Sequence, residues 1–222
     1  MTRTRLTLCL SALIALSSSA AVAADDDVSK VNGSITVEAG QTRGDVETVN
    51  GSIRIGDNAA VDGASTVNGS ISAGDGARAN RLETVNGSIR VGSKFTASAG
   101  LTTVNGGIFV DRGGRLKGDV ETVNGSIGLV ATELNGGIET VNGDVTVGID
   151  SHVTGGIKYT KPTGNFTFQR RDPIVIVGPN ARVDGPLVFE RSVKLYVHTS
   201  AKTGAVRGAT AIAFSGATPP AQ

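Results

Sequence analysis

The residue types best suited to contact another molecule are concentrated in residues 158–172. This segment holds one of the two tyrosines of the chain, two of its six phenylalanines and four basic residues. Aromatic rings together with cations favour contact with carbohydrate, with an anionic envelope polymer or with protein. The alternative is a self-packed hairpin in which the two phenylalanines cover the neighbouring structure. We predict a binding surface made of Lys158, Tyr159, Lys161, Phe166, Phe168, Arg170 and Arg171.

Two glutamates and two histidines are the other residues that could do chemistry. Glu121 and Glu139 lie one repeat apart and could share a cation, or they could form a solvated pair, since carboxylates interact weakly in water. His152 and His198 have no partner cluster in the sequence and are expected to be surface residues. Metal-ligand spacings, nucleophile elbows and phosphate-binding loops are absent, so we predict no catalytic residue, no metal site and no cofactor.

These residues belong to a repeat that must position them. The segment Val49-Asn50-Gly51-Ser52-Ile53 recurs along the chain with small changes. Its asparagines are separated by 18, 18, 18, 19, 19 and 18 residues, and a period this regular indicates a repeat architecture. The asparagines are Asn32, Asn50, Asn68, Asn86, Asn105, Asn124 and Asn142.

Each repeat contains turn signals and short strand signals. Asparagine and glycine tolerate positive φ better than other residues, so each Asn-Gly pair predicts a corner. The following Ser-Ile-x-Val pattern, as in residues 52–55, places apolar residues two apart and predicts a short strand with one buried face. A second signature, apolar-Gly-x-x-Ala-x-Val-x-Gly, occurs at residues 55–63 and again at 177–185.

One period therefore holds three turns and three short strands. This pattern predicts an all-β fold, a single-stranded three-sided β-solenoid (β-helix) with about 18 residues per coil. Coils paired in parallel would stack equivalent asparagines into a hydrogen-bonded ladder. A meander of hairpins is the competing fold, because Asn-Gly is also a hairpin signal. Glycine-rich turns about every six residues are too close together for a stable meander.

The outer surface of the solenoid is expected to be polar. Arg54 and Arg90 occupy one outward position and Phe109 follows there. Such a mixed face can bind polysaccharide, and it also keeps a solenoid soluble. Six threonines two residues before the corner asparagines are likewise expected to face outward: Thr48, Thr66, Thr84, Thr103, Thr122 and Thr140.

Residues 1–24 have the organisation of a secretory signal peptide. Arg3 and Arg5 precede an apolar stretch too short to span a bilayer, and residues 21–23 form a small-residue cleavage site. We expect the solenoid to occupy residues 25–207, with an insert at about 158–172, because the second signature repeats after 30 residues instead of 18. Residues 208–222 are expected to form a C-terminal cap or a loose tail.

The charge of the mature chain is nearly balanced. Removal of Arg3 and Arg5 leaves 19 basic and 20 acidic residues, a net charge of −1. A near-neutral chain lacks the electrostatic footprint of a nucleic-acid-binding protein. The remainder contains no stretch apolar enough for a membrane helix. We expect an exported protein in the bacterial periplasm, at the cell surface or secreted.

The repeated Val-Asn-Gly-Ser-Ile coils behind a signal peptide resemble the exported β-strand-repeat domains classed as adhesins of unknown function. The coil period is also similar to that of bactofilins, which polymerise. These resemblances imply a non-enzymatic cell-envelope structural or adhesive protein, self-association through the coil ends, and a polysaccharide or protein partner. The alternatives are a carbohydrate-active enzyme similar to β-helix polysaccharide lyases, or a hexapeptide-repeat acyltransferase, which residues 55–66 resemble.

Overall fold

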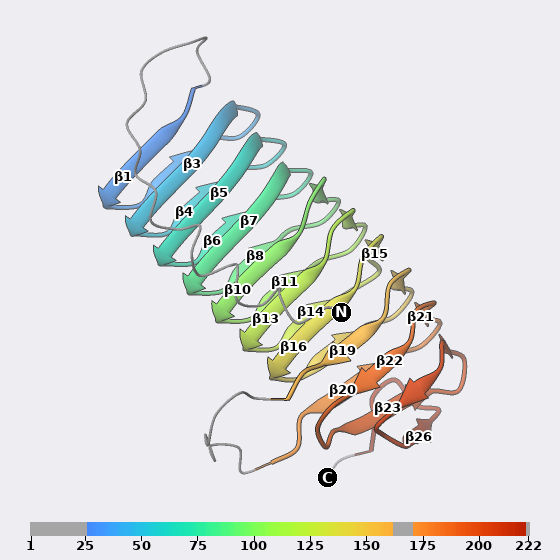
Figure 1. Cartoon of the computed structure of the whole chain (residues 1–222). Helices are drawn as coiled ribbons and strands as arrows, with labels where there is room; N and C mark the ends of the chain where they lie inside the picture. The colour runs from blue at the N-terminus through green and yellow to red at the C-terminus, as the bar shows by residue number, and fades with distance from the viewer. Residues whose placement is uncertain (1–25, 162–170, 221–222) are drawn as a thin grey trace.

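The computed structural model describes residues 26–161 and 171–220, and every helix or strand element in these ranges is a β-strand. Successive coils stack along one axis, from β1 (Val28–Asn32) to β26 (Ala211–Phe214) (Figure 1). The pairings are parallel, and most join residues 18 or 19 positions apart, as in Asn50↔Asn68. The predicted all-β solenoid with about 18 residues per coil is therefore confirmed.

The first face is a ladder of ten strands, one from each coil. Two inward side chains flank one outward side chain, as in Ile53, Arg54 and Ile55, where only Arg54 is exposed. Its strands are β2 (Ile35–Val37), β4 (Ile53–Ile55), β6 (Ile71–Ala73), β8 (Ile89–Val91), β11 (Ile108–Val110), β14 (Ile127–Leu129), β17 (Val145–Val147), β20 (Ile174–Val177), β23 (Lys194–His198) and β26.

The second face carries the strands that lead into the Asn-Gly corners. In the early coils these strands are nine residues long, because each begins on the third face and continues onto the second face without a break. The ladder contains β1, β3 (Thr42–Asn50), β5 (Ala60–Asn68), β7 (Arg78–Asn86), β10 (Leu101–Asn105), β13 (Val120–Asn124), β16 (Ile138–Asn142), β19 (Ile157–Tyr159), β22 (Leu187–Phe189) and β25 (Val206–Arg207).

The third face begins with the first halves of β3, β5 and β7 and continues as separate two-residue strands. The inward residues of all three faces form one slim core made mainly of valine, isoleucine, leucine and alanine. The separate strands are β9 (Thr96–Ala97), β12 (Arg115–Leu116), β15 (Glu133–Leu134), β18 (His152–Val153), β21 (Arg182–Val183) and β24 (Lys202–Thr203).

The corner asparagines form the predicted ladder. Each Nδ2 donates to the Oδ1 of the preceding asparagine at 2.9–3.0 Å, from Asn50 through Asn142. The last acceptor, Asn142 Oδ1, is bound by the guanidinium of Arg191, which also donates to the carbonyl of Val141 at 3.1 Å. The ladder thus runs through seven coils and ends on a cation.

We expect Asn86→Ala to lower the free energy of unfolding by about 1–3 kcal/mol, because two hydrogen bonds are lost together. Asn32→Ala, at the start of the ladder, removes only the bond from Asn50 and should cost about half as much. Urea denaturation of the two variants measures both effects. Equal stability of Asn86→Ala and the wild type would contradict a stabilising ladder.

The glycines of the Asn-Gly corners are explained by close contact between coils and not by the expected positive φ. The corner asparagines do not have positive φ, so the prediction that positive φ makes the corner is wrong for them. A Cβ on each corner glycine after the first would overlap the carbonyl oxygen of the corner glycine in the preceding coil. Apart from the corner glycines Gly33 and Gly143, positive φ occurs in the second signature, at residues such as Asn58 and Asn180. Glycine is therefore required at the Asn-Gly corner by the close approach of the coils.

The threonines two residues before the corner asparagines are buried, not outward as expected. Side chains alternate along a strand, so when Glu47 faces solvent Thr48 must face the core. The buried hydroxyl is satisfied because Thr48 Oγ1 donates to the Gly33 carbonyl at 3.1 Å. The next four threonines donate in the same way at 2.8–3.0 Å: Thr66, Thr84, Thr103 and Thr122.

The ends of the solenoid differ from the expected boundaries. The first face extends through β26 to Phe214, beyond the expected limit of 207. Residues 1–24, interpreted as a signal peptide, lie outside the described residues. Within the described ranges, no helix is long and apolar enough to cross a membrane.

Candidate functional site

Two of the seven residues predicted to form a binding surface belong to the solenoid itself. Lys158 and Tyr159 lie in β19, whose register pairs them with Glu139 and Thr140 of the preceding coil. The ladders resume at β20, so the extra residues fall between β19 and β20, within residues 160–173, and begin two residues later than the expected 158–172. Phe166, Phe168 and Arg170 lie outside the described residues.

Tyr159 is a core residue and not a surface contact. Its side chain is 0% exposed, and its hydroxyl donates to the carbonyl of Gly143 at 2.8 Å. This bond repeats the one made by the buried threonines, so tyrosine takes the threonine position in this coil. Burial, together with the negative charge of Asp144, raises the pKa of Tyr159 far above its usual value. The prediction that Tyr159 contacts a ligand is wrong, because no ligand can reach the ring.

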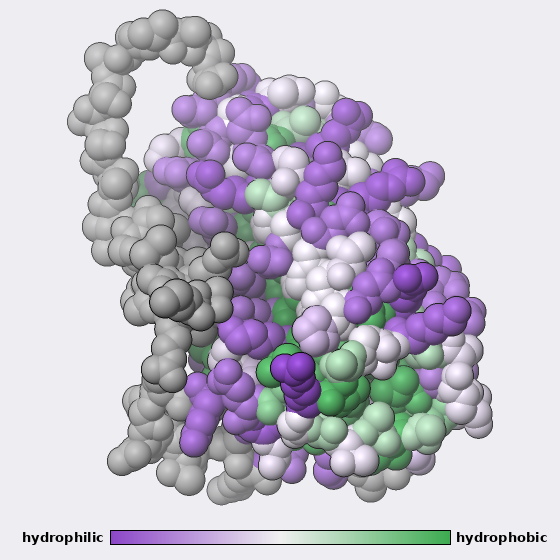
Figure 2. Space-filling view, turned by 45° about the vertical axis from the view of Figure 1, so that its right-hand side comes forward, coloured by the Kyte–Doolittle hydropathy of each residue, from purple (hydrophilic) through white to green (hydrophobic). Residues whose placement is uncertain are grey.

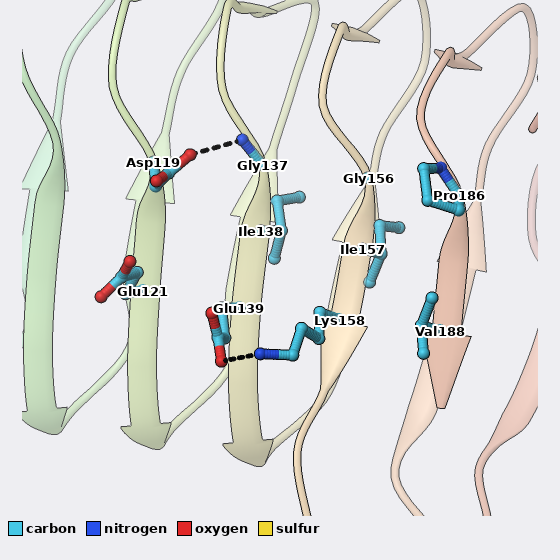
Figure 3. A pocket seen from close by; sticks show the side chains of 10 residues that line it. All are labelled: Asp119, Glu121, Gly137, Ile138, Glu139, Gly156, Ile157, Lys158, Pro186 and Val188. Carbon is cyan, nitrogen blue, oxygen red and sulfur yellow. Dashed lines mark hydrogen bonds and ion pairs between the residues drawn. The ribbon is translucent and has the colours of Figure 1, made fainter. Parts of the chain in front are cut away.

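Lys158 lies in a shallow groove on the second face (Figure 3). Its ammonium group donates to Glu139 at 2.8 Å, and Asp119 accepts a hydrogen bond from the Gly137 amide at 2.8 Å. Glu121 and Glu139 line the same groove of about 240 Å³. Glu139 is thus engaged by Lys158 on the following coil. Among the described residues, no group of three or more His, Cys, Asp and Glu is placed to hold a metal ion.

Arg171 and Lys161 lie at the two ends of the insert and bind the solenoid. The Arg171 guanidinium donates to both carboxylate oxygens of Asp144, at 3.1 and 2.8 Å. Asp144 also accepts the backbone N–H of Ile174 at 2.9 Å, which fixes the start of β20. The Lys161 amide donates to Glu190 at 3.2 Å. The described ends of the insert are therefore anchored by carboxylates of the solenoid.

The Asp144 contact predicts a pH dependence. Burial raises the pKa of Asp144, but the hydrogen bonds from Arg171 and the Ile174 amide and the guanidinium charge outweigh it, and the pKa lies below its usual value. A depressed pKa means that the contribution to stability is present above the unfolded value, near pH 4, and is lost as the pH falls through the folded value.

We therefore expect Asp144→Asn to lower the free energy of unfolding by about 1 kcal/mol at pH 7, a modest value because Arg171 is largely exposed, and by less at pH 2. Denaturation curves of wild type and variant at both pH values test this. Arg171→Gln removes the other partner of the ion pair, and its effect should likewise be smaller at pH 2 than at pH 7. A cost that is the same at both pH values would contradict the ionic anchor.

The histidines have partners that the sequence analysis missed. His152 lies on the third face with Nδ1 3.1 Å from Glu133 and Nε2 2.8 Å from Asp184. Asp184 also accepts from Arg182. The hydrogen bond from His152, then that from Arg182, lowers the pKa of Asp184. His198 contacts Ser200 at 2.8 Å and stacks edge-on against Phe214. Both imidazole nitrogens of His152 can donate at once only when the ring is protonated.

The first face holds the expected outward row. Arg90 and Phe109 are direct neighbours in the ladder, and Phe109 is 39% exposed. The phenyl ring lies against Gly128 of the following coil. Together with Thr146 and Asp144 these residues line an open groove of about 390 Å³.

Comparison of the chain with known protein families, with curated proteins and with solved structures found no match. What the chain does must therefore be argued from its surface.

Proposed function

We propose that the protein is a non-enzymatic, exported β-solenoid that acts through its surface as a structural or adhesive component of the cell envelope. The observation that carries this proposal is the three-faced stack of coils. Polar outward side chains repeat along it at the coil spacing, as in Glu47, Ser65 and Glu83. Such extended faces suit contact with long polymers. The signal-peptide features of residues 1–24 support export to the periplasm or the cell surface.

Fractionation of cells that express a tagged full-length chain tests this proposal. We expect the protein in the periplasmic or surface fraction, and we expect the purified mature chain to co-sediment with isolated envelope. A protein found only in the cytoplasmic fraction, or one that does not bind envelope, would contradict the proposal.

Self-association through the coil ends is part of the proposal. Within the described residues, β24, β25 and β26 each end a ladder, and exposed strand edges can pair with another chain. Figure 2 shows apolar surface toward the C-terminal end of the body, where Ala211, Ile212 and Ala213 are exposed. End-to-end contacts of unlike surfaces generate open filaments. Light scattering and negative-stain imaging of residues 25–222 should show concentration-dependent growth; a monomer at all concentrations would exclude it.

The insert between β19 and β20 is proposed to contribute contacts. Lys161 and Arg171 remain candidates, together with Phe166, Phe168 and Arg170. Exchanging residues 162–170 for a Gly-Ser linker of equal length preserves Tyr159 and the Arg171–Asp144 anchor. We expect weaker envelope binding by this variant; unchanged binding would remove the insert from the proposal.

A polysaccharide-cleaving enzyme is the second candidate, favoured by the cluster of Glu133, His152 and Asp184. Carboxylates next to an imidazole are residues of general acid–base catalysis. This candidate requires turnover of a polysaccharide by purified protein, measured as new reducing ends or unsaturated products, and loss of turnover in His152→Gln.

A further inference from the structure

The largest of the three grooves described lies on the third face and has a volume of about 520 Å³. Its floor is formed at Ala79, Ala97 and Leu116, which point into the core. Two rows of outward side chains border it, one on each side of this floor. The first row is Arg78, Thr96 and Arg115, and the second is Asn80, Ser98 and Lys117.

Three cations in this groove have no ion-pair partner among the described residues. Within residues 26–161 and 171–220, the side chains of Arg78, Arg115 and Lys117 make no hydrogen bond or ion pair. Arg78 and Arg115 are separated by one coil, so their backbones lie about 10 Å apart, and Lys117 lies opposite Arg115. The chain has 21 basic and 20 acidic residues, so this excess of positive charge is local.

The groups between the cations are hydroxyls and amides. Thr96, Ser98, Asn80 and Asn135 all line the groove, and Ser98 donates to Asn80 at 2.7 Å. Among the described lining residues, the acidic ones lie toward the two ends: Asp62 at one end and Glu133 at the other, where Glu133 is next to Arg115 in the ladder and is bound to His152. The centre of the groove therefore offers positive charge and neutral hydrogen-bonding groups together.

From this arrangement we infer that the third-face groove binds a segment of an acidic glycan. Its carboxylates or phosphates pair with Arg78, Arg115 and Lys117, and its hydroxyls bond to the intervening serine, threonine and asparagine side chains. A nucleic-acid strand fits less well, because none of the described residues that line the groove is aromatic, so a base would have no ring to stack on. The inference rests on the proposed function and specifies the polymer that the envelope would supply.

Isothermal titration of the mature chain with oligogalacturonate, with polyglycerol phosphate and with neutral dextran tests the inference. We expect binding of one or both anionic polymers that weakens with added salt, and no binding of dextran. The two anionic probes separate a carboxylate source from a phosphate source. A dT oligonucleotide that binds as tightly as the better glycan would overturn the assignment to glycan.

The decisive variant is Arg78→Gln/Arg115→Gln/Lys117→Gln, which should weaken binding roughly tenfold or more, because three exposed ionic contacts are lost. Lys30→Gln/Arg112→Gln/Arg207→Gln removes the same charge from positions that line none of the three grooves and should bind as the wild type does. An equal loss in both triple variants would overturn the site. Envelope binding without affinity for either anionic polymer refutes this inference alone, whereas absence of envelope binding refutes the proposed function.

Discussion

Tyr159→Ala is expected to lower the free energy of unfolding by about 3–5 kcal/mol, the range for removal of a large buried aromatic side chain. The ring fills the coil where the insert departs, and it packs against Phe189 with ring centroids 5.5 Å apart. Removing it leaves a cavity and frees the Gly143 carbonyl from its hydrogen bond. Chemical denaturation monitored by circular dichroism measures the loss.

Two variants separate the causes of that loss. Tyr159→Phe keeps the ring and should cost only about 1–2 kcal/mol for the unsatisfied carbonyl. Phe109→Ala removes a ring that is 39% exposed and should cost under about 1 kcal/mol. A stable Tyr159→Ala protein with impaired envelope binding would contradict the buried role and restore Tyr159 as a contact residue.

Gly106→Ala is expected to destabilise the solenoid by about 3 kcal/mol or more, at the upper end of the range for overpacking. The added methyl group would overlap the carbonyl oxygen of Gly87, and the obstacle is backbone held by the Asn-Gly corner of the preceding coil. Relief would require separating two coils. Loss of soluble expression or a large shift of the urea midpoint would reveal the effect.

Gly128→Ala is the matched control in the same part of the body. Its new methyl group would meet only the ring of Phe109, at 3.2 Å, and that side chain can move because it is exposed. We expect a change under about 1 kcal/mol, partly offset by the reduced freedom of the unfolded chain. Similar losses in both glycine variants would show that coil contact is not the cause.

The sequence was sufficient to predict the coil architecture because its period is nearly constant. Equivalent residues must stack when every coil has about 18 residues, and this predicted the ladder of asparagines. The predicted outward direction of the Thr48 side chain was wrong, because threonine resembles valine in shape and can be buried when its hydroxyl is hydrogen-bonded. Its backbone acceptor cannot be identified from the repeat spacing alone. The equivalent carbonyl of Gly143 explains Tyr159, which replaces threonine in the last strand before the insert.

The site was less predictable, because side chains on one face come from distant positions. His152 contacts Glu133 and Asp184, which are 19 and 32 residues away in the sequence. The separation of 32 residues exceeds one coil because the insert lies between His152 and Asp184. An alignment of the coils that left the insert out would have placed these three residues at neighbouring positions. Arg78, Arg115 and Lys117 could have been aligned in the same way, but which of them lack an ionic partner is visible only in the structure.

The asparagine ladder gives the solenoid an electrical direction. Its amides all point the same way, with nitrogen toward the N-terminal coil and oxygen toward Asn142, so their dipoles add as peptide dipoles do in a helix. The guanidinium of Arg191 lies at the negative end, where a cation is favoured. Because Arg191 closes this chain of dipoles before the C-terminal coils, a second copy that stacked on β26 could not prolong it. Any filament would be a series of separately terminated dipoles rather than one continuous dipole.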